Sequence, residues 1–236
     1  MTQGRRGRGA AGEPRRGTLG TRAPLIGLIG PIGCGKSTVA GWLAELGAIV
    51  VDADRLTRDL MAPGTPVTES ILARFGEEYR LADGSLDRAV LGRLVFADPA
   101  RLAELESIVH PAVGRLERET IRSADARRPS VIVLEAIKLV EAGHARWCDE
   151  VWLIVCEPAA QLARLTGRGM AEPDARQRIA AQAASLSLWR SAATRTIRTD
   201  GDPAAVRTAI SAALDRLRQA GGSPSGAEAG SGPPST

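Results

Sequence analysis

Short apolar runs alternate with longer amphipathic stretches along most of the chain. Apolar runs rich in β-branched residues, each followed by a helical stretch, are typical of a parallel sheet with helices on both faces. The pattern therefore predicts an α/β fold of three layers. The predicted strands cover residues 24–29, 48–51, 130–135, 149–156 and, in a shorter run, 194–199.

Helical spacing of apolar residues fills the intervals between these strands. It predicts helices over 36–46, 87–96, 99–124 and 203–217, with Gly47 ending the first of them. No convincing strand occurs between about residues 60 and 125, so this segment is predicted to be a helical insertion. In the helix starting at Glu157, glycine and proline interrupt the pattern, and the segment 164–182 is interpreted as a lid.

Composition divides the chain into an ordered body and two tails. The 236 residues carry a net charge of +4, and residues 1–23 hold six arginines against one glutamate. This basic arm lacks apolar periodicity and is predicted to be disordered, with weak nucleic-acid contact as the lesser alternative. The segment 220–236, rich in Gly, Ser and Pro, is predicted to be a disordered tail. One domain remains over 24–219.

The number of cysteines and the hydropathy of the chain indicate in which cellular compartment the protein is located. Cys34, Cys148 and Cys156 show no metal-ligand spacing, and so small and odd a number suits a reducing environment. No apolar run approaches the roughly 18 to 20 residues that a membrane span needs. We expect a cytoplasmic protein without a membrane partner.

The clearest chemical signal follows the first predicted strand. The stretch GPIGCGKST satisfies GxxxxGK[ST] between a strand and a helix. Glycines let successive N–H groups point at a phosphate chain, and the helix adds the positive end of its dipole. Lys36 is expected to reach the β and γ phosphates, and the Ser37 hydroxyl to coordinate Mg²⁺. The predicted ATP-binding residues are Gly30, Pro31, Ile32, Gly33, Cys34, Gly35, Lys36, Ser37 and Thr38.

The phosphate loop predicts nucleotide binding but not the reaction that follows. Two carboxylates narrow the set of possible reactions. Asp52 and Asp54 follow the second strand and should lie at the same sheet edge as the loop. One of them could orient or deprotonate an attacking hydroxyl. The equal alternative is that Asp54 simply caps a helix running from Arg55.

Further charged residues have weaker signals. Glu135 ends the third strand, where a carboxylate near a phosphate loop commonly holds the metal through water. Arg164, Arg168 and Arg178 flank the interrupted lid segment and could neutralise charge on a transferring phosphoryl group. In so arginine-rich a chain, a solvated helix face is at least as good an explanation for any one of them. His110, before Pro111 at a predicted helix junction, favours a structural role.

Together these motifs resemble the dephospho-coenzyme A kinase family over about residues 24–218. The segment 27–60 is similar to the family's phosphate loop and following Asp-Ala-Asp. The segment 84–113 is similar to its second signature, with Arg93, Phe96 and His110-Pro111, and 161–182 is similar to its lid. The combination is far more specific than the phosphate loop alone. It implies a P-loop kinase core with a helical coenzyme-binding lobe.

The resemblance implies transfer of the ATP γ-phosphoryl group to the ribose 3′-hydroxyl of dephospho-coenzyme A. The partners are then dephospho-coenzyme A and ATP, with Mg²⁺ as cofactor, and the product is coenzyme A. Lys36, Asp54 and Arg168 become the implied catalytic residues, and Arg164 joins the ATP site. The implied acceptor-side residues are Asp52, Arg93 and His110, and the implied metal contacts are Ser37 and, through water, Glu135.

The chain departs from the family pattern at several positions. Pro31 and Cys34 replace small residues inside the phosphate loop, between its essential glycines. After Glu135 the family has an aliphatic residue and Pro-Leu-Leu, whereas this chain has Ala-Ile-Lys-Leu. Lys138 thereby adds charge near the acceptor, where it either contacts a phosphate or remains at the surface.

The sequence is also compatible with two other functions. One is a P-loop kinase for another nucleoside, nucleotide or small alcohol. The other is a non-catalytic ATP-binding regulator that uses the altered segment after Glu135 and the basic arm for a partner.

Overall fold

A parallel sheet forms the centre of the molecule. The computed structural model describes residues 17–221. Within them the strands are β1 (Leu25–Ile29), β2 (Ala48–Asp52), β3 (Val131–Glu135), β4 (Glu150–Val155) and β5 (Arg195–Arg198). Their order across the sheet is β2-β3-β1-β4-β5, and every pair is parallel. All five strands thus end at one edge.

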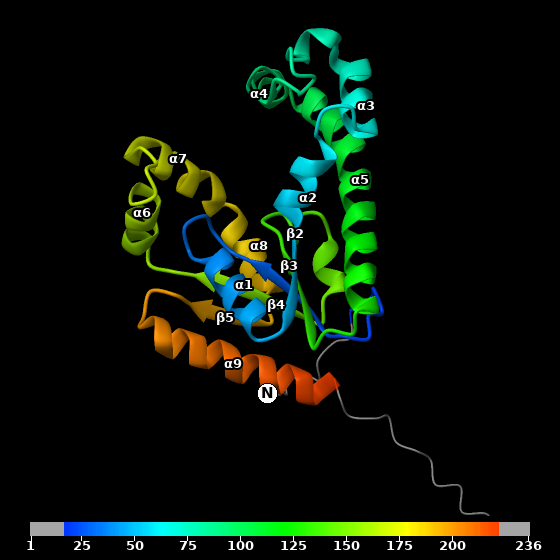
Figure 1. The fold of residues 1–236 in the computed structure, drawn as a ribbon. Coiled ribbons are helices and arrows are strands. Elements are labelled where there is room, and N and C mark those ends of the chain that lie inside the picture. Colours follow the sequence, from blue (N-terminus) through cyan, green and yellow to red (C-terminus); the bar gives the residue numbers. More distant parts are fainter. Residues whose placement is uncertain (1–16, 222–236) are drawn as a thin grey trace, which may run out of the picture.

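Helices surround the sheet and extend beyond that edge (Figure 1). In chain order they are α1 (Lys36–Glu45), α2 (Ala53–Leu60), α3 (Pro66–Phe75), α4 (Arg88–Ala97), α5 (Pro99–Ala126), α6 (Pro158–Thr166), α7 (Glu172–Ala183), α8 (Ser185–Ala192) and α9 (Pro203–Gly221). Short 3₁₀ turns cover Glu77–Tyr79 and His144–Trp147. The predicted strand and helix order is confirmed.

Side-chain alternation along β1 shows how the layers pack. Ile26 and Leu28 lie in a core that contains residues of α1 and α9. Leu25 and Ile29 lie in a second core on the other face, with residues of α5 and α8. Because a strand's neighbours point to opposite faces, a continuous apolar run is needed to fill both cores. The three-layer α/β prediction is therefore confirmed.

The helical insertion forms a lobe with its own core. Val67, Ile71 and Leu72 of α3 pack with Leu91 and Val95 of α4 against the first half of α5. The second half of α5 packs on the sheet, so one long helix joins the lobe to the body (Figure 1).

The helix predicted over 99–124 is confirmed by α5, but the helix junction predicted at His110 is wrong. The 28 residues of α5 run without interruption through Pro111. Proline removes one backbone donor and normally kinks or breaks a helix. Packing on both the lobe and the sheet outweighs that local signal here, since the apolar face of α5 continues across the proline.

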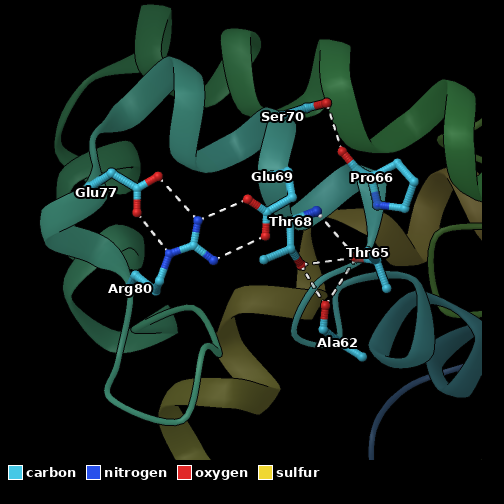
Figure 2. A network of polar contacts seen from close by, with 8 residues as sticks. All are labelled: Ala62, Thr65, Pro66, Thr68, Glu69, Ser70, Glu77 and Arg80. Carbon is cyan, nitrogen blue, oxygen red and sulfur yellow. Dashed lines mark hydrogen bonds and ion pairs between the residues drawn. The ribbon is translucent and has the colours of Figure 1, made fainter.

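A polar network fixes the start of the lobe (Figure 2). The Thr65 hydroxyl accepts a hydrogen bond from the backbone N–H of Thr68 and caps α3. Arg80 donates to both Glu69 on α3 and Glu77 in the turn that follows it, at 2.7–3.1 Å. Such exposed pairs contribute little singly, but here one guanidinium joins two segments of the lobe.

The ordered body begins earlier than the sequence suggested. Residues 17–23 belong to the predicted disordered arm, yet they are anchored to the core. The Gly17 N–H donates to Asp149 at 2.8 Å, and the Ala23 N–H donates to Asp125 at 2.9 Å. Half-buried carboxylates that accept backbone N–H groups from a distant segment are not visible in sequence periodicity. The rest of the arm, 1–16, and the predicted tail from residue 222 lie outside the described residues.

No helix within residues 17–221 combines the length and the hydropathy that crossing a membrane requires.

Candidate active site

The phosphate loop connects β1 to α1 and takes a conformation that its glycines make accessible. Gly30, Gly33 and Gly35 have φ values of 144°, 78° and 87°. A Cβ atom added at Gly30 would lie 2.1 Å from the Ile154 carbonyl oxygen on the neighbouring strand. The loop therefore curls tightly against β4 and leaves its backbone bare for a ligand.

Lys36 lies at the first position of α1, folded back across the loop. Its Nζ donates to the Gly30 carbonyl at 2.7 Å, and only 8% of the residue is exposed. Burial lowers the pKa of this ammonium group, while the charges of Glu135 and Asp54 oppose the decrease. The lysine is thus held within the loop by a contact that a phosphate oxygen can replace.

Two carboxylates at the ends of β2 and β3 lie side by side. The β2–β3 register pairs Asp52 with Glu135. The Ser37 hydroxyl of α1 donates to Glu135 Oε1 at 3.2 Å, and burial raises the pKa of the Glu135 carboxyl. A hydroxyl and a carboxylate beside the lysine of a phosphate loop form a set of hard oxygen donors.

This donor set fits Mg²⁺. Magnesium usually keeps several waters and takes one or two protein oxygens together with substrate phosphates. In residues 17–221 no group of three or more His, Cys, Asp or Glu side chains converges to hold a metal by itself. Ser37 and Glu135 suit an ion that is held mainly by phosphate and water.

Asp52, the last residue of β2, and Asp54 in the helix that follows have different surroundings. Asp52 is the N-cap of α2, because its carboxylate accepts from the Arg55 N–H at 2.9 Å. The alternative in which Asp54 caps that helix is wrong, and so is continued strand geometry, since α2 begins at Ala53. Asp54 instead lies in the first turn of α2. Its pKa is raised by burial and by the Asp52 charge, and the Lys36 charge partly offsets this.

Asp54 lines a cavity of about 370 Å³ between the lobe and the body, which we call the lobe cavity. Its walls come from α2, α4, α5 and the segment after β3, and they are mostly aliphatic. The apolar lining residues include Met61, Leu102, Leu105, Val109, Ile137 and Leu139. A large apolar cavity with a few polar groups is the usual form of a small-molecule site.

The predicted acceptor residues fall in different places around this cavity. His110 and Lys138 line it and are 52% and 71% exposed. Both approach Glu106 Oε1, at 3.8 Å and 3.7 Å, so Glu106 joins them at the rim. Arg93 lies on α4 and is exposed, outside the cavity lining. Asp52 is engaged as a helix cap.

A second cavity of about 240 Å³, the lid cavity, lies on the opposite side of the phosphate loop. Gly35 and Thr38 of the loop region, Trp42 of α1 and the residues around Thr199 line it, together with Arg164 and Arg168. Arg164 donates to the Thr199 hydroxyl at 3.0 Å. Both arginines therefore lie beside the helix that follows the phosphate loop, whereas Arg178 lies on the exposed surface of α7.

Two glutamines attach the lid to the phosphate loop. Gln161 of α6 donates to the Ile32 carbonyl at 2.7 Å. Gln182 of α7 accepts from the Ile32 N–H at 2.8 Å. Because both backbone groups of one loop residue are bound by the lid, movement of α6 and α7 is coupled to the shape of the loop.

A disulfide joins Cys34 in the phosphate loop to Cys156 after β4. The sequence indicated a reducing environment and gave no sign of this pair, whose members are 122 positions apart. They meet because β1 and β4 are neighbouring strands, so the segments following them leave the sheet together. Cys148 is the free and buried cysteine.

Sequence reasoning missed several cavity residues. Glu106, Glu117 and His144 line the lobe cavity, and Trp42 lines the lid cavity. On α5, the spacing of Glu106, His110 and Glu117 over four and seven residues places them on one helix face, a signal that the sequence did contain. His144 had no such signal, because it lies in a loop far along the chain.

A phosphate loop after the central strand of a five-stranded parallel sheet, with a helical lobe and a lid, defines a P-loop kinase. The family model for dephospho-CoA kinase matches residues 24–203. The chain therefore belongs to the dephospho-CoA kinase family, in agreement with the resemblance in its sequence.

Individual relatives agree with this assignment. A dephospho-CoA kinase of Geobacter metallireducens is 47% identical over 162 residues, 67% of this chain and 79% of the relative. One from Moorella thermoacetica is 38% identical over 83% of this chain and 92% of its own. The crystal structure of TT1252 from Thermus thermophilus has a TM-score of 0.70 at 33% identity, covering 83% of this chain and 98% of that one. Dephospho-CoA kinase from Campylobacter jejuni, at 21% identity and a TM-score of 0.62 over 83% and 97%, shares the fold.

Proposed function

We propose that this protein transfers the γ-phosphoryl group of ATP to the ribose 3′-hydroxyl of dephospho-CoA, the last step of coenzyme A synthesis. The position of Asp54 supports this most directly. Its carboxylate lines the lobe cavity and also interacts with the charge of Lys36 in the phosphate loop. One side chain thus faces both a chamber for an acceptor and the loop that receives the donor.

Asp54 is the proposed base. In this role its carboxylate accepts a hydrogen bond from the attacking hydroxyl and takes its proton as the new P–O bond forms. Burial and the Asp52 charge raise the pKa of Asp54, which strengthens its carboxylate as a proton acceptor. The neighbouring helix cap keeps Asp52 itself out of this step.

The donor side is formed by the phosphate loop and the lid cavity. We propose that Lys36 exchanges its Gly30 contact for oxygens of the β and γ phosphates. The adenine part of ATP then lies in the lid cavity, beside Arg164 and Arg168. Arg168 remains our candidate for neutralising charge during transfer, once closure of α6 and α7 brings it nearer.

Magnesium is the proposed cofactor, with Ser37 and, through water, Glu135 as its contacts. When bound, such an ion supplies neutralising charge to the phosphates of ATP. The chain's own part is to position the Ser37 hydroxyl and to orient it through Glu135.

On the acceptor side we propose that His110 and Lys138 hold the polar end of dephospho-CoA at the rim of the lobe cavity. Lys138 has a surface side chain with one carboxylate neighbour, Glu106, so its ammonium group is available to a pyrophosphate. The aliphatic walls behind the rim suit the less polar arm of the same molecule. An enclosed acceptor also competes better with water.

Release of ADP by the purified protein, measured with and without dephospho-CoA, tests the proposal. We expect release that depends on dephospho-CoA and formation of coenzyme A. Activity with a different alcohol in an acceptor panel would instead indicate another P-loop kinase. ATP binding without acceptor-dependent release would indicate a regulator.

Replacing the base gives a sharper test. In Asp54→Asn we expect turnover to fall by about 10²-fold or more, because general base catalysis of this kind contributes roughly 10² to 10⁴. ATP binding should persist. Asp59→Asn, which changes an exposed aspartate of the same helix, is the matched control and should remain active. Equal turnover in the two variants would remove Asp54 from the mechanism.

Two further proposals concern the cellular location of the protein and the role of its basic arm. We propose a cytoplasmic location, which cell fractionation tests. Weak nucleic-acid contact through the arm predicts an affinity that falls with salt and disappears when residues 1–16 are deleted.

A further inference from the structure

A buried histidine–glutamate pair lies in the wall of the lobe cavity, and no step of the proposed transfer uses it. His144 Nδ1 lies 2.7 Å from Glu117 Oε2, and both residues line the cavity. Glu117 belongs to α5 and is 3% exposed. His144 belongs to the short turn after β3. Two segments far apart in sequence thus meet in this pair.

The pair is strictly oriented. The imidazole of His144 stacks on the Trp147 indole, with ring centroids 3.7 Å apart and an angle of 13° between the planes. Glu117 Oε2 is fully buried and has no hydrogen-bond partner within residues 17–221, although His144 Nδ1 approaches it to 2.7 Å. A carboxylate oxygen in that position is costly without a hydrogen-bond donor. A proton on His144 Nδ1 faces Glu117, so the buried carboxylate favours that tautomer of the imidazole.

Fixing that proton determines what the other nitrogen can do. In a neutral imidazole with its proton on Nδ1, Nε2 is a hydrogen-bond acceptor. Gly114 of α5 lies beside the ring, and a Cβ added there would be in ordinary van der Waals contact with Nε2 at 3.4 Å. His144 lines the lobe cavity, and Nε2 has no hydrogen-bond partner in the described part of the chain.

The side chains around His144 limit the chemical class of ligand that could bind there. Most of the cavity wall is aliphatic, and its formal charges other than Asp54 and Glu117 lie at the rim, with Lys138 and Glu106. A charged group near His144 would lose its hydration among aliphatic side chains. A neutral group with an N–H donor on an otherwise apolar chain fits better. Secondary amides separated by methylene groups have this chemistry.

We propose that His144, oriented by Glu117, accepts a hydrogen bond from an amide N–H of the pantetheine arm of the acceptor. This inference rests on the proposed function and adds to it a determinant of acceptor specificity. His144 is then a binding residue, and Glu117 is a positioning residue that acts through the imidazole. The arm is recognised away from the phosphate loop and away from Asp54.

Binding of pantetheine alone tests the inference without any phosphoryl transfer. Calorimetry would compare the wild-type protein with His144→Phe, which keeps an aromatic ring over Trp147 but removes Nε2. Loss of one neutral hydrogen bond corresponds to roughly 3- to 10-fold weaker binding. We expect a decrease of that size for pantetheine, and a similar rise in KM for dephospho-CoA with little change in KM for ATP. Arg146→Gln, an exposed change in the same turn, should leave all three unchanged.

Variants of Glu117 separate orientation from folding. Glu117→Gln keeps an acceptor for Nδ1–H and should bind pantetheine nearly as the wild type does. Glu117→Leu removes that acceptor and should weaken pantetheine binding as His144→Phe does, with near-ultraviolet circular dichroism reporting the fold. Equal affinity of wild type and His144→Phe, or no pantetheine binding by the wild type, would overturn the inference. Absence of acceptor-dependent ADP release would overturn the proposed function alone.

Discussion

The disulfide between Cys34 and Cys156 leads to a quantitative prediction for stability. A cross-link lowers the entropy of the unfolded chain, and the effect grows with the length of the loop it closes. For the separation of 122 residues seen here, the chain-entropy relation gives about 5 kcal/mol at 25 °C. Measured values are usually nearer to 2–4 kcal/mol, so we expect Cys156→Ser to lower the free energy of unfolding by about that amount.

Urea unfolding with and without a thiol reductant measures this difference. Reductant should destabilise the wild type and leave Cys156→Ser unchanged, so the variant is the internal control. Burial raises the pKa of the Cys148 thiol, so this third cysteine stays protonated and should not react with thiol reagents in the folded state. An oxidised wild type with three titratable thiols, or one with the stability of Cys156→Ser, would refute the reasoning.

Reduction should change the stability of the phosphate loop more than its shape. The Cys34 carbonyl also accepts a hydrogen bond from the Thr199 hydroxyl at 2.6 Å, and Ile32 is held by Gln161 and Gln182. These contacts do not depend on the sulfur atoms. We therefore expect reduced protein to bind ATP at temperatures well below its unfolding transition.

Three further predictions concern the two cavities and the loop. Asp54 acts as a base only when ionised and its pKa is raised, so kcat/KM should decrease as pH falls through that pKa. Part of this acid-side decrease should be absent from the residual activity of Asp54→Asn. The same decrease in the variant would assign it to Glu135, whose pKa is also raised. Trp42 lines the lid cavity, so ATP should change tryptophan fluorescence in the wild type and much less in Trp42→Phe. Gly30→Ala should abolish ATP binding, which calorimetry would detect, because its Cβ would meet the Ile154 carbonyl at 2.1 Å; normal binding would show that the loop can relax.

Local sequence determined most of the fold. Continuous apolar runs can be satisfied only by strands buried on both faces, and helical spacing between them requires helices on both sides of the sheet. The phosphate loop could also be predicted from the sequence. Its positive φ values require glycine, and its lysine follows these glycines at a fixed spacing, so both requirements are local. The α5 helix shows the limit of single-residue signals. Helical spacing predicted one helix over 99–124 while proline at position 111 indicated a junction within it, and packing on two cores maintains the single helix.

The sequence by itself specified the strands, the phosphate loop and the carboxylates at the strand ends, since these depend on residues near one another in the chain. Only the tertiary structure decided which aspartate caps α2 and which faces the lobe cavity, because that depends on where the strand stops. It alone brought Cys34 to Cys156 and His144 to Glu117. The physical reason is the same for both pairs. These contacts form because the packing of neighbouring strands and of α5 brings together segments that are far apart in the chain, and residue spacing does not predict such packing.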